Sequence, residues 1–372
     1  MTKRKTKLTS IEIGGFKSIA YDKPLRLMMS DINILLGANG AGKTNIISFF
    51  RMLGFMMSGT LQKHVAEKGT SSSFLNYGPK RTPRLYAKLK FQDEKNVDMY
   101  EIELSHASGN RLIITDEKLS WERQEEENPF NIQIDNNFHE SGLINSDDRV
   151  SKTVRALLSS CKAYQFHDTS QDGYLRQAST VKSARYLQSR GNNLASFLYL
   201  LNNEYHDEYQ RIVSYVQMVM PSFADFVLEP VGGYVQLNWT DNCPNDYVLS
   251  ADQFSDGTIR FIALATLLLQ PAELMPSVII IDEPELGLHP YAIGQLIEMI
   301  EDASLHAQII ISTQSPQLID GFSADNVTVV EMNEDEHSTT AHQLSEEALS
   351  EWLKDYQLSD LWNKNIIGGR PV

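Results

Sequence analysis

The chain of 372 residues has little cysteine and no long apolar run. Its two cysteines, Cys161 and Cys243, cannot make a four-thiolate zinc site and do not resemble a disulfide framework, so a reducing compartment is expected. The strongest apolar stretch, Phe261–Leu269, is about half the length that a membrane span needs. No apolar segment of signal-peptide type follows the basic N-terminal residues. We therefore expect a cytoplasmic protein with no membrane partner.

Positive charge is also scarce. The 33 lysines and arginines stand against 48 aspartates and glutamates, so the formal net charge is −15 at pH 7. This balance opposes nucleic-acid binding by the chain as a whole, although a local basic face for DNA or RNA is compatible with it. Internal repeats and sustained heptads are lacking, which excludes a long coiled coil. The 42% hydrophobic and 22% charged residues are ordinary for a globular protein that buries a core.

Short continuous apolar runs predict a buried parallel sheet. Such runs occupy Ile32–Leu36, Val278–Ile281 and Gln308–Ile311, and each is followed by polar residues or glycine. Strands that helices cover on both faces carry runs of this kind. Helical periodicity is found at Asn45–Met56, Ile259–Leu269 and Ala292–Ile300. The two ends of the chain are therefore expected to form one α/β unit.

The middle of the chain has a different pattern. Alternating apolar and polar residues at Leu85–Phe91, Asp98–Leu104 and Arg111–Leu119 predict antiparallel strands. The polar segment Glu122–Asp148 is expected to be a long exposed connection. A mostly helical region is expected at Ser183–Met220, where apolar residues recur with helical spacing.

The segment Ser345–Asp360 predicts an amphipathic helix. It begins with a serine and has two glutamates in its first turn, which is a plausible helix N-terminus. Trp352 and Trp362 are expected to be packing anchors for this part of the chain.

The strongest motif reads Gly37-Ala-Asn-Gly-Ala-Gly-Lys43-Thr44 and fits the phosphate-loop pattern G-x-x-x-x-G-K-[ST]. A predicted strand precedes it and a predicted helix follows it, as the motif requires. Glycines let the backbone curl so that its N–H groups point at phosphate oxygens, and the helix N-terminus adds partial positive charge. Lys43 is expected to reach the β- and γ-phosphates, and the Thr44 hydroxyl to ligate Mg²⁺. A chance match is the alternative, which this flanking context disfavours.

A second motif places two adjacent carboxylates after the apolar run Val278–Ile281. Neighbouring residues at the end of a strand point in different directions, so Asp282 and Glu283 can take different roles. Asp282 is expected to hold Mg²⁺ through its water shell, and Glu283 to polarise a water that attacks the γ-phosphate. The structural alternative is an acidic turn that caps the next helix, with Pro284 entering that helix.

A third motif, S-D-G-T at Ser255–Thr258, precedes a predicted helix. A serine hydroxyl and a glycine N–H at a helix start form a second phosphate site. One nucleotide cannot easily use both sites of one chain if they lie on opposite lobes, so a two-fold dimer in which each chain completes its partner's site is expected. The alternative is an ordinary N-cap and turn.

These motifs, together with the later I-S-T-Q-S-P, resemble the ABC-type ATPase heads of the SMC, RecF and OLD group. The opening Ile11–Ile19, with its F-K-S-I, is similar to the N-terminal strand of that group. The nearest likeness is to compact RecF-like ATPases of bacteria, which occur in DNA repair and anti-phage defence. The resemblance implies an α/β P-loop fold with a mixed, mainly parallel core sheet, an antiparallel β lobe, an inserted helical lobe and no coiled coil. It implies a first lobe over residues 1–160, a helical signature lobe over 161–258 and a return to the ATPase core over 259–372.

The resemblance also implies roles for single residues. The residues that would cradle the phosphates of ATP are Asn39, Gly40, Ala41, Gly42, Lys43, Thr44 and Asn45. Lys17 and Ser18 fall near the nucleotide base in such heads. Ser255 and Gly257 match the signature serine and second glycine, which contact the γ-phosphate held by the opposite protomer.

Magnesium is implied at Thr44 and Asp282, and the loop after residue 164 falls where such heads carry a magnesium-sensing glutamine. Gln165, His167 and Asp168 all lie in this loop, and the sequence leaves open which of them takes that place. Asp168 is the candidate that could ligate the ion directly.

Two departures from the family pattern bear on turnover. Asp256 replaces the first signature glycine and places negative charge near a phosphate site, which predicts slow turnover or a nearby cation. Gln314 stands where many ABC proteins have a switch histidine. Glutamine can donate a hydrogen bond to the γ-phosphate but carries no proton at neutral pH, so both departures favour slow hydrolysis.

The favoured function is that of an ATPase that dimerises around two ATP molecules and acts as a switch in DNA repair or anti-phage defence. Homodimers or larger homo-oligomers are expected, with a separate nuclease or toxin partner. The first alternative is the ATPase subunit of an ABC transporter, against which Gln314 and the F-K-S-I segment argue. The second is a scaffold that holds ATP without turnover.

Overall fold

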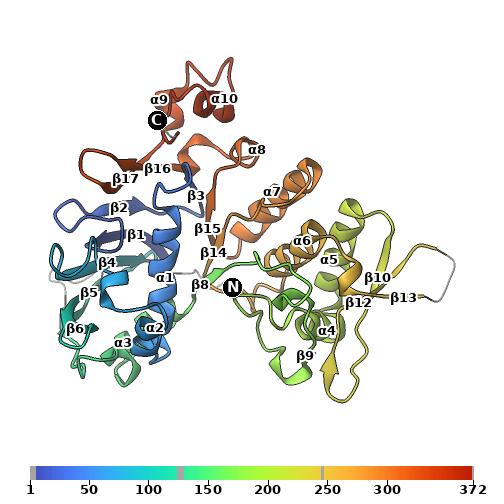
Figure 1. The fold of residues 1–372 in the computed structure, drawn as a ribbon, viewed down its shortest axis with the longest axis horizontal. Helices are drawn as coiled ribbons and strands as arrows, with labels where there is room; N and C mark the ends of the chain where they lie inside the picture. The colour runs from blue at the N-terminus through green and yellow to red at the C-terminus, as the bar shows by residue number, and fades with distance from the viewer. Residues whose placement is uncertain (1–5, 124–129, 244–246, 371–372) are drawn as a thin grey trace.

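The structure is a computed structural model that describes residues 6–123, 130–243 and 247–370 (Figure 1). A six-stranded mixed sheet lies at its centre, in the order β17-β16-β3-β15-β14-β8. The strands from β16 to β8 run parallel, and β17 pairs antiparallel with β16 at one edge. The strands are β3 Ile32–Leu36, β8 Cys161–Tyr164, β14 Val278–Asp282, β15 Gln308–Thr313, β16 Val327–Asn333 and β17 Ser338–Gln343. The expected mixed, mainly parallel core sheet is confirmed.

The apolar strands of this sheet are buried on both faces. Ile280 and Ile310 face a core that includes α1, whereas Ile279, Ile309 and Ile311 face a second core that includes α6 and α7. The helices are α1 Lys43–Met57, α6 Asp256–Leu268 and α7 Pro290–Ser304. This arrangement explains why every residue of β14 and β15 is buried and why their sequences do not alternate.

A second six-stranded sheet is antiparallel throughout, in the order β2-β1-β4-β5-β6-β7, and forms the lobe on the left of Figure 1. Its strands are β1 Lys7–Gly14, β2 Leu25–Met28, β4 Arg84–Gln92, β5 Asn96–Ala107, β6 Arg111–Arg123 and β7 Phe130–Gln133. Along β4, Leu85, Ala87 and Leu89 point into the core shared with α1, as their alternation predicts. Two further helices of this lobe are α2 Leu61–Glu67 and α3 Arg149–Ser159.

A third part of the chain lies between β8 and α6, on the right of Figure 1. Its helices and strands are β9 Ser179–Thr180, α4 Leu194–Glu204, α5 His206–Val219, β10 Phe223–Val227, β11 Tyr234–Val235, β12 Asn238–Asp241 and β13 Val248–Ser250. The Trp239 ring stacks on Phe223 and Phe254, with centroids 6.0 and 4.8 Å away. This aromatic cluster anchors the residue that directly precedes the S-D-G-T motif.

The expectation of one long exposed connection over Glu122–Asp148 is wrong for the described part of that segment. Strand β7 adds an edge to the antiparallel sheet, and the buried Glu117 carboxylate anchors the residues beyond it. Glu117 accepts hydrogen bonds from Ser141 Oγ at 2.5 Å and from the Gly142 N–H at 2.9 Å. Polar composition does not reveal such an anchor, because a buried carboxylate looks like any other acidic residue in the sequence. Residues 124–129 lie outside the described residues.

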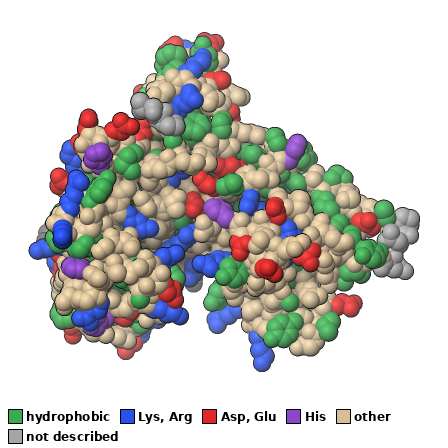
Figure 2. Space-filling model, viewed as in Figure 1, with side chains coloured by type: hydrophobic (Ala, Val, Ile, Leu, Met, Phe, Trp, Pro, Cys, Tyr) green, Lys and Arg blue, Asp and Glu red, His purple; other side chains and the backbone are tan. Residues whose placement is uncertain are grey.

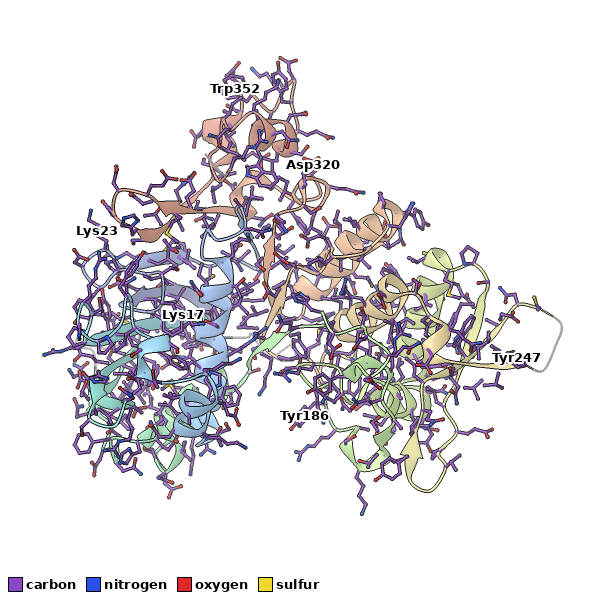
Figure 3. The ribbon with its side chains drawn as sticks, in the orientation of Figure 1. Lys17, Lys23, Tyr186, Tyr247, Asp320 and Trp352 are labelled. Carbon is purple, nitrogen blue, oxygen red and sulfur yellow. The ribbon has the colours of Figure 1, made fainter. Side chains whose placement is uncertain are left out.

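The expectation of a single amphipathic helix over Ser345–Asp360 is also wrong. The short helices in this part of the chain are α8 Pro316–Ile319, α9 Glu346–Leu349 and α10 Leu358–Asn363. Ser345 does cap α9, since its Oγ accepts the Ala348 N–H at 3.4 Å. Trp362 is buried as expected, but Trp352 is 45% exposed on the projection at the top of Figure 3.

No helix within the described ranges is long and apolar enough to cross a membrane. The longest described helices, α1 and α7, have 15 residues each, so this part of the chain contains no long coiled coil.

Candidate nucleotide-binding site

The phosphate loop leaves the carboxyl end of β3 and enters α1. Gly42 is the N-cap residue with φ of 108°, and an added Cβ there would lie 2.1 Å from Thr339 Oγ1, so only glycine fits. The N–H groups of Gly42, Lys43 and Thr44 donate to no protein acceptor within the described residues. Three such donors at the positive end of a 15-residue helix form a cradle for an anion. The residues present therefore fit a bound phosphate group.

The Lys43 side chain is buried against the loop that precedes it. Its ammonium donates to the carbonyl oxygens of Gly37 at 2.6 Å and Ala38 at 2.9 Å. Burial lowers the pKa of Lys43, and the nearby carboxylates of Glu283 and Asp282 act in the opposite direction. The ammonium is thus held between the phosphate loop and the acidic end of β14.

The F-K-S segment is attached to the phosphate loop. Ser18 Oγ accepts a hydrogen bond from Asn45 Nδ2 at 2.6 Å and pairs with Thr339 Oγ1 at 2.7 Å. Lys17 has φ of 50° and is held there by its N–H, which donates to the Phe74 carbonyl at 2.9 Å. The structure therefore brings Lys17, Ser18 and Asn45 together. Thr339 belongs to the same group, and no sequence motif marked it.

Basic side chains gather near Lys17 although the net charge of the chain is −15. Burial lowers the pKa of Lys17, with smaller contributions from the charges of Lys68 and Arg51. Burial also lowers the pKa of Arg51, Asp282 acts in the opposite direction and Arg190 adds to the decrease. The Nη2 atom of Arg51 is buried without a hydrogen-bond partner among the described residues. Figure 2 shows Lys and Arg side chains where the left and right lobes meet. Lys17, Arg51, Lys68 and Arg190 therefore lie near one another on a chain of net negative charge.

The two carboxylates that follow β14 have different surroundings. Asp282 is buried, and its Oδ1 accepts a hydrogen bond from Ser312 Oγ at 2.6 Å. Glu283 has φ of 45°, and its N–H donates to the Ser312 carbonyl at 3.0 Å. A glutamate in the left-handed region costs of order 1 kcal/mol, and such strain is concentrated at functional sites. Asp282 therefore belongs to the extended backbone of β14, whereas Glu283 follows it in the left-handed region.

A third carboxylate near this site, Glu285, was not singled out by any sequence motif. Its Oε1 accepts hydrogen bonds from Thr313 Oγ1 at 2.6 Å and from the Gln314 N–H at 3.3 Å. Burial raises the pKa of Glu285, and its Oε2 is buried with no partner among the described residues. The backbone of Gln314 is thus fixed to the loop after β14. The second glutamate of D-E-P-E was the available signal.

The loop after β8 brings two of its three candidate residues to β14. His167 Nε2 lies 2.9 Å from the Asp282 carbonyl oxygen, and Gln165 Nε2 lies 3.1 Å from His167 Nδ1. Asp168 is exposed and accepts a hydrogen bond from Ser170 Oγ at 2.6 Å. No hydrogen bond in the described part of the chain joins Asp168 to β14, so the geometry favours Gln165 and His167 for the place next to Asp282.

The S-D-G-T motif forms the exposed start of α6. Ser255 is the N-cap residue, and its Oγ accepts the Thr258 N–H at 3.1 Å. A Cβ added to Gly257 would lie 2.4 Å from the carbonyl oxygen of Gly287, so glycine is required where α6 meets the loop after β14. No hydrogen bond or ion pair in the described chain joins this motif to the phosphate loop. The two predicted phosphate-binding segments are separate features of one chain.

Two buried arginines support this motif. Arg176, whose side chain is 5% exposed, lies 3.2 Å from the Asp256 carboxylate, so a cation, one of the two expected consequences of this aspartate, is present beside it. Arg260 donates to the carbonyl oxygens of Phe166 at 3.0 Å and of Leu286, so it connects α6 to the loops after β8 and β14. The signal for Arg260 was a single cation within an otherwise apolar helix.

Magnesium would find oxygen ligands at two places in this site. The Asp282 carboxylate and the Thr44 hydroxyl are hard oxygen donors of the type that Mg²⁺ prefers. No group of three or more His, Cys, Asp or Glu side chains within the described residues could hold a metal ion. A Mg²⁺ ion would therefore depend on phosphate oxygens and water for the rest of its ligands.

Two solved structures of SMC heads are similar to this chain. The first is an SMC head bound to the C-terminal winged-helix domain of ScpA, with a TM-score of 0.58, 15% identity and coverage of 92% of this chain and 99% of that chain. The second, derived from Pyrococcus furiosus, is an SMC head with an extended coiled coil bound to the C-terminal domain of ScpA, with a TM-score of 0.58, 13% identity and coverage of 94% and 99%. Identity this low shows the fold alone. A comparison with curated proteins gives no match.

The chain thus has the fold of SMC head domains, with a phosphate loop at the carboxyl end of β3. Residues 32–320 match the family described as "AAA domain, putative AbiEii toxin, Type IV TA system". Because this match covers more than half of the chain, the chain belongs to that family.

Proposed function

We propose that this chain binds Mg²⁺ and ATP and slowly hydrolyses ATP to ADP and phosphate. The observation that carries this proposal is that Lys43 lies near Asp282 and Glu283, beside three N–H groups at the start of α1 that have no partner among the described residues. These groups lie at the carboxyl ends of parallel strands, where α/β sheets bind ligands.

Each part of the site has a proposed role. The loop Asn39–Asn45 binds the phosphates, and the Lys43 ammonium, which has three donors, stays bound to the Gly37 carbonyl and also donates to phosphate oxygens. Thr44 and Asp282 supply oxygen ligands for Mg²⁺, which when bound neutralises phosphate charge. Glu283 orients and polarises the attacking water, and Gln314 donates a hydrogen bond to the γ-phosphate without carrying a proton.

We propose that two copies of the chain share each ATP. Ser255 is exposed and Gly257 is half-buried at the start of α6, so a second copy can approach this end of the helix from outside. A two-fold dimer would place this motif of one chain opposite the phosphate loop of the other, with Lys17 and Ser18 beside the nucleotide base. Residues 1–160, 161–258 and 259–372 would then act as the first lobe, the signature lobe and the return to the ATPase core.

The dimer is proposed to be a cytoplasmic switch for a separate nuclease or toxin in anti-phage defence or DNA repair. The family description, which names the AbiEii toxin and a type IV toxin–antitoxin system, supports this setting. Both similar SMC heads are bound to a domain of a separate protein, ScpA. The basic side chains near Lys17 support DNA or RNA as a further ligand.

Phosphate release from the purified chain tests the enzyme assignment. Wild type should release phosphate from ATP in the presence of Mg²⁺, and Glu283→Gln should lower the rate at least about tenfold because the water loses its polarising carboxylate. Lys43→Ala should abolish ATP binding in a fluorescence titration. Equally little release from wild type and Glu283→Gln, with binding intact, would favour the scaffold without turnover.

Light scattering tests the dimer. Glu283→Gln should accumulate a dimer with ATP and Mg²⁺, because ATP persists between the two heads. Adding Ser255→Arg to this variant should prevent the dimer without preventing ATP binding, since the substitution blocks only the surface offered to the second copy. A particle of unchanged size in Glu283→Gln with saturating ATP contradicts the shared site.

A further inference from the structure

The segment Ile367–Arg370 lies against the phosphate loop at Gly37 and Ala38. The Ala38 N–H donates to the Gly369 carbonyl at 2.9 Å. The Gly369 N–H donates to Glu331 Oε1 at 2.5 Å, which ties the segment to β16 at the point where it passes the loop. Residues far apart in the sequence are thereby joined beside the phosphate loop.

This contact and Lys43 hold the same peptide group. The peptide that joins Gly37 to Ala38 offers its carbonyl oxygen to Lys43 Nζ at 2.6 Å and its N–H to Gly369 at 2.9 Å. Because a peptide group is planar, fixing the direction of its N–H also fixes the direction of its carbonyl oxygen. The position of Gly369 therefore bears on an anchor of the Lys43 ammonium.

Packing leaves room only for glycine at this contact. Gly369 has φ of +81°, and an added Cβ would lie 2.8 Å from Val329 Cγ1 and 3.3 Å from Trp362 Nε1. A Cβ added to Gly37 would lie 2.2 Å from the Val330 carbonyl oxygen. The two backbones approach each other and β16 more closely than side chains would permit.

The rest of the segment is held in place on either side of the contact. Ile367 is 5% exposed in the same core as Trp362, and the Arg370 guanidinium donates to the Asn363 carbonyl. The contact is therefore part of a packed structure that can resist movement of the loop.

We propose that Gly369 and Glu331 are positioning residues of the nucleotide site, because they hold the peptide that anchors Lys43. This inference rests on the proposed function, since it concerns the loop that is proposed to bind ATP. A role in folding alone would change stability without changing the affinity of the folded protein for nucleotide.

The test measures affinity of the full chain for a fluorescent ATP analogue with Mg²⁺, together with thermal unfolding. Gly369→Ala and Glu331→Ala should weaken affinity at least about tenfold, equivalent to about 1.4 kcal/mol. Phosphate release at saturating ATP should fall less than affinity does, because Glu283 is untouched. Glu331→Gln keeps an acceptor for the Gly369 N–H and should bind like wild type.

Gly233→Ala is the matched control for backbone strain. Gly233 has φ of +84°, close to that of Gly369, but no atom lies within 4 Å of an added Cβ. It should bind the analogue like wild type. Wild-type affinity in folded Glu331→Ala and Gly369→Ala overturns the positioning role while the proposed function stands. If wild type itself does not bind the analogue, the proposed function fails and this inference fails with it.

Discussion

The buried Glu285 carboxylate predicts that Glu285→Gln makes the protein more stable at neutral and basic pH. Glutamine keeps an oxygen for Thr313 and Gln314, which now donate to Glu285 Oε1 at 2.6 and 3.3 Å. It removes a buried negative charge whose second oxygen has no partner within the described residues. The hydrogen bonds are therefore retained while the cost of burying a charge is removed.

The gain is expected to be about 1 kcal/mol of unfolding free energy at about pH 8, the scale of desolvating an incompletely paired polar group. This corresponds to about 2 °C in melting temperature for a large domain. The charge of Glu283 raises the pKa of Glu285 further, whereas the nearby Lys43 ammonium favours the charged form of the Glu285 carboxylate. Both Glu283 and Lys43 remain in the variant.

The effect should depend on pH with a definite sign. Burial raises the pKa of Glu285 above its ordinary value of 4.5, so folding takes up a proton at this group. The stability that wild type gains from Glu285 is therefore full below pH 4.5 and is lost as the pH rises through the folded pKa. The advantage of Glu285→Gln should shrink as the pH falls from about 8 toward 5.

Thermal unfolding of both proteins across that pH range checks this prediction. Glu298→Gln, at an exposed glutamate of α7, is the control for a change in net charge. Glu285→Ala should be destabilising, because the Thr313 hydroxyl loses its acceptor. A Glu285→Gln protein that is less stable than wild type throughout, or whose advantage does not change with pH, would refute the reasoning.

Three further substitutions test other parts of the structure. Gly257→Ala should displace the loop at Gly287 and lower phosphate release at least about tenfold while ATP binding by the single chain persists, and wild-type release would contradict this. Arg260→Ala should lower the free energy of unfolding by about 3 kcal/mol in a denaturant titration, because the Phe166 carbonyl loses a buried partner. Ile310→Ala should cost about 3 kcal/mol in the same titration, since Ile310 is 1% exposed in the core beneath α1, and a loss under 1 kcal/mol would count against that packing.

Local patterns in the sequence were enough for the central elements. The apolar run Ile32–Leu36 matches β3, and the glycine-rich loop enters a helix at Lys43, because strand burial and helix periodicity depend on near neighbours. The same patterns failed over Ser345–Asp360, where helical spacing occurs but two short helices form. Trp352 is exposed there, so it does not supply the tertiary packing that would stabilise a longer helix.

The sequence by itself determined which residues are proposed to carry the chemistry. The phosphate loop, Asp282 and Glu283 were identified as candidates from residue type and spacing alone, since each lies at the end of a strand or the start of a helix. Only the tertiary structure decided what holds them in place. Ser18 pairs with Thr339, Glu285 with Thr313, and Gly369 with Ala38, and these partners are far apart in the chain. Such contacts depend on how the whole chain packs, so they cannot be predicted from the spacing of residues in the sequence.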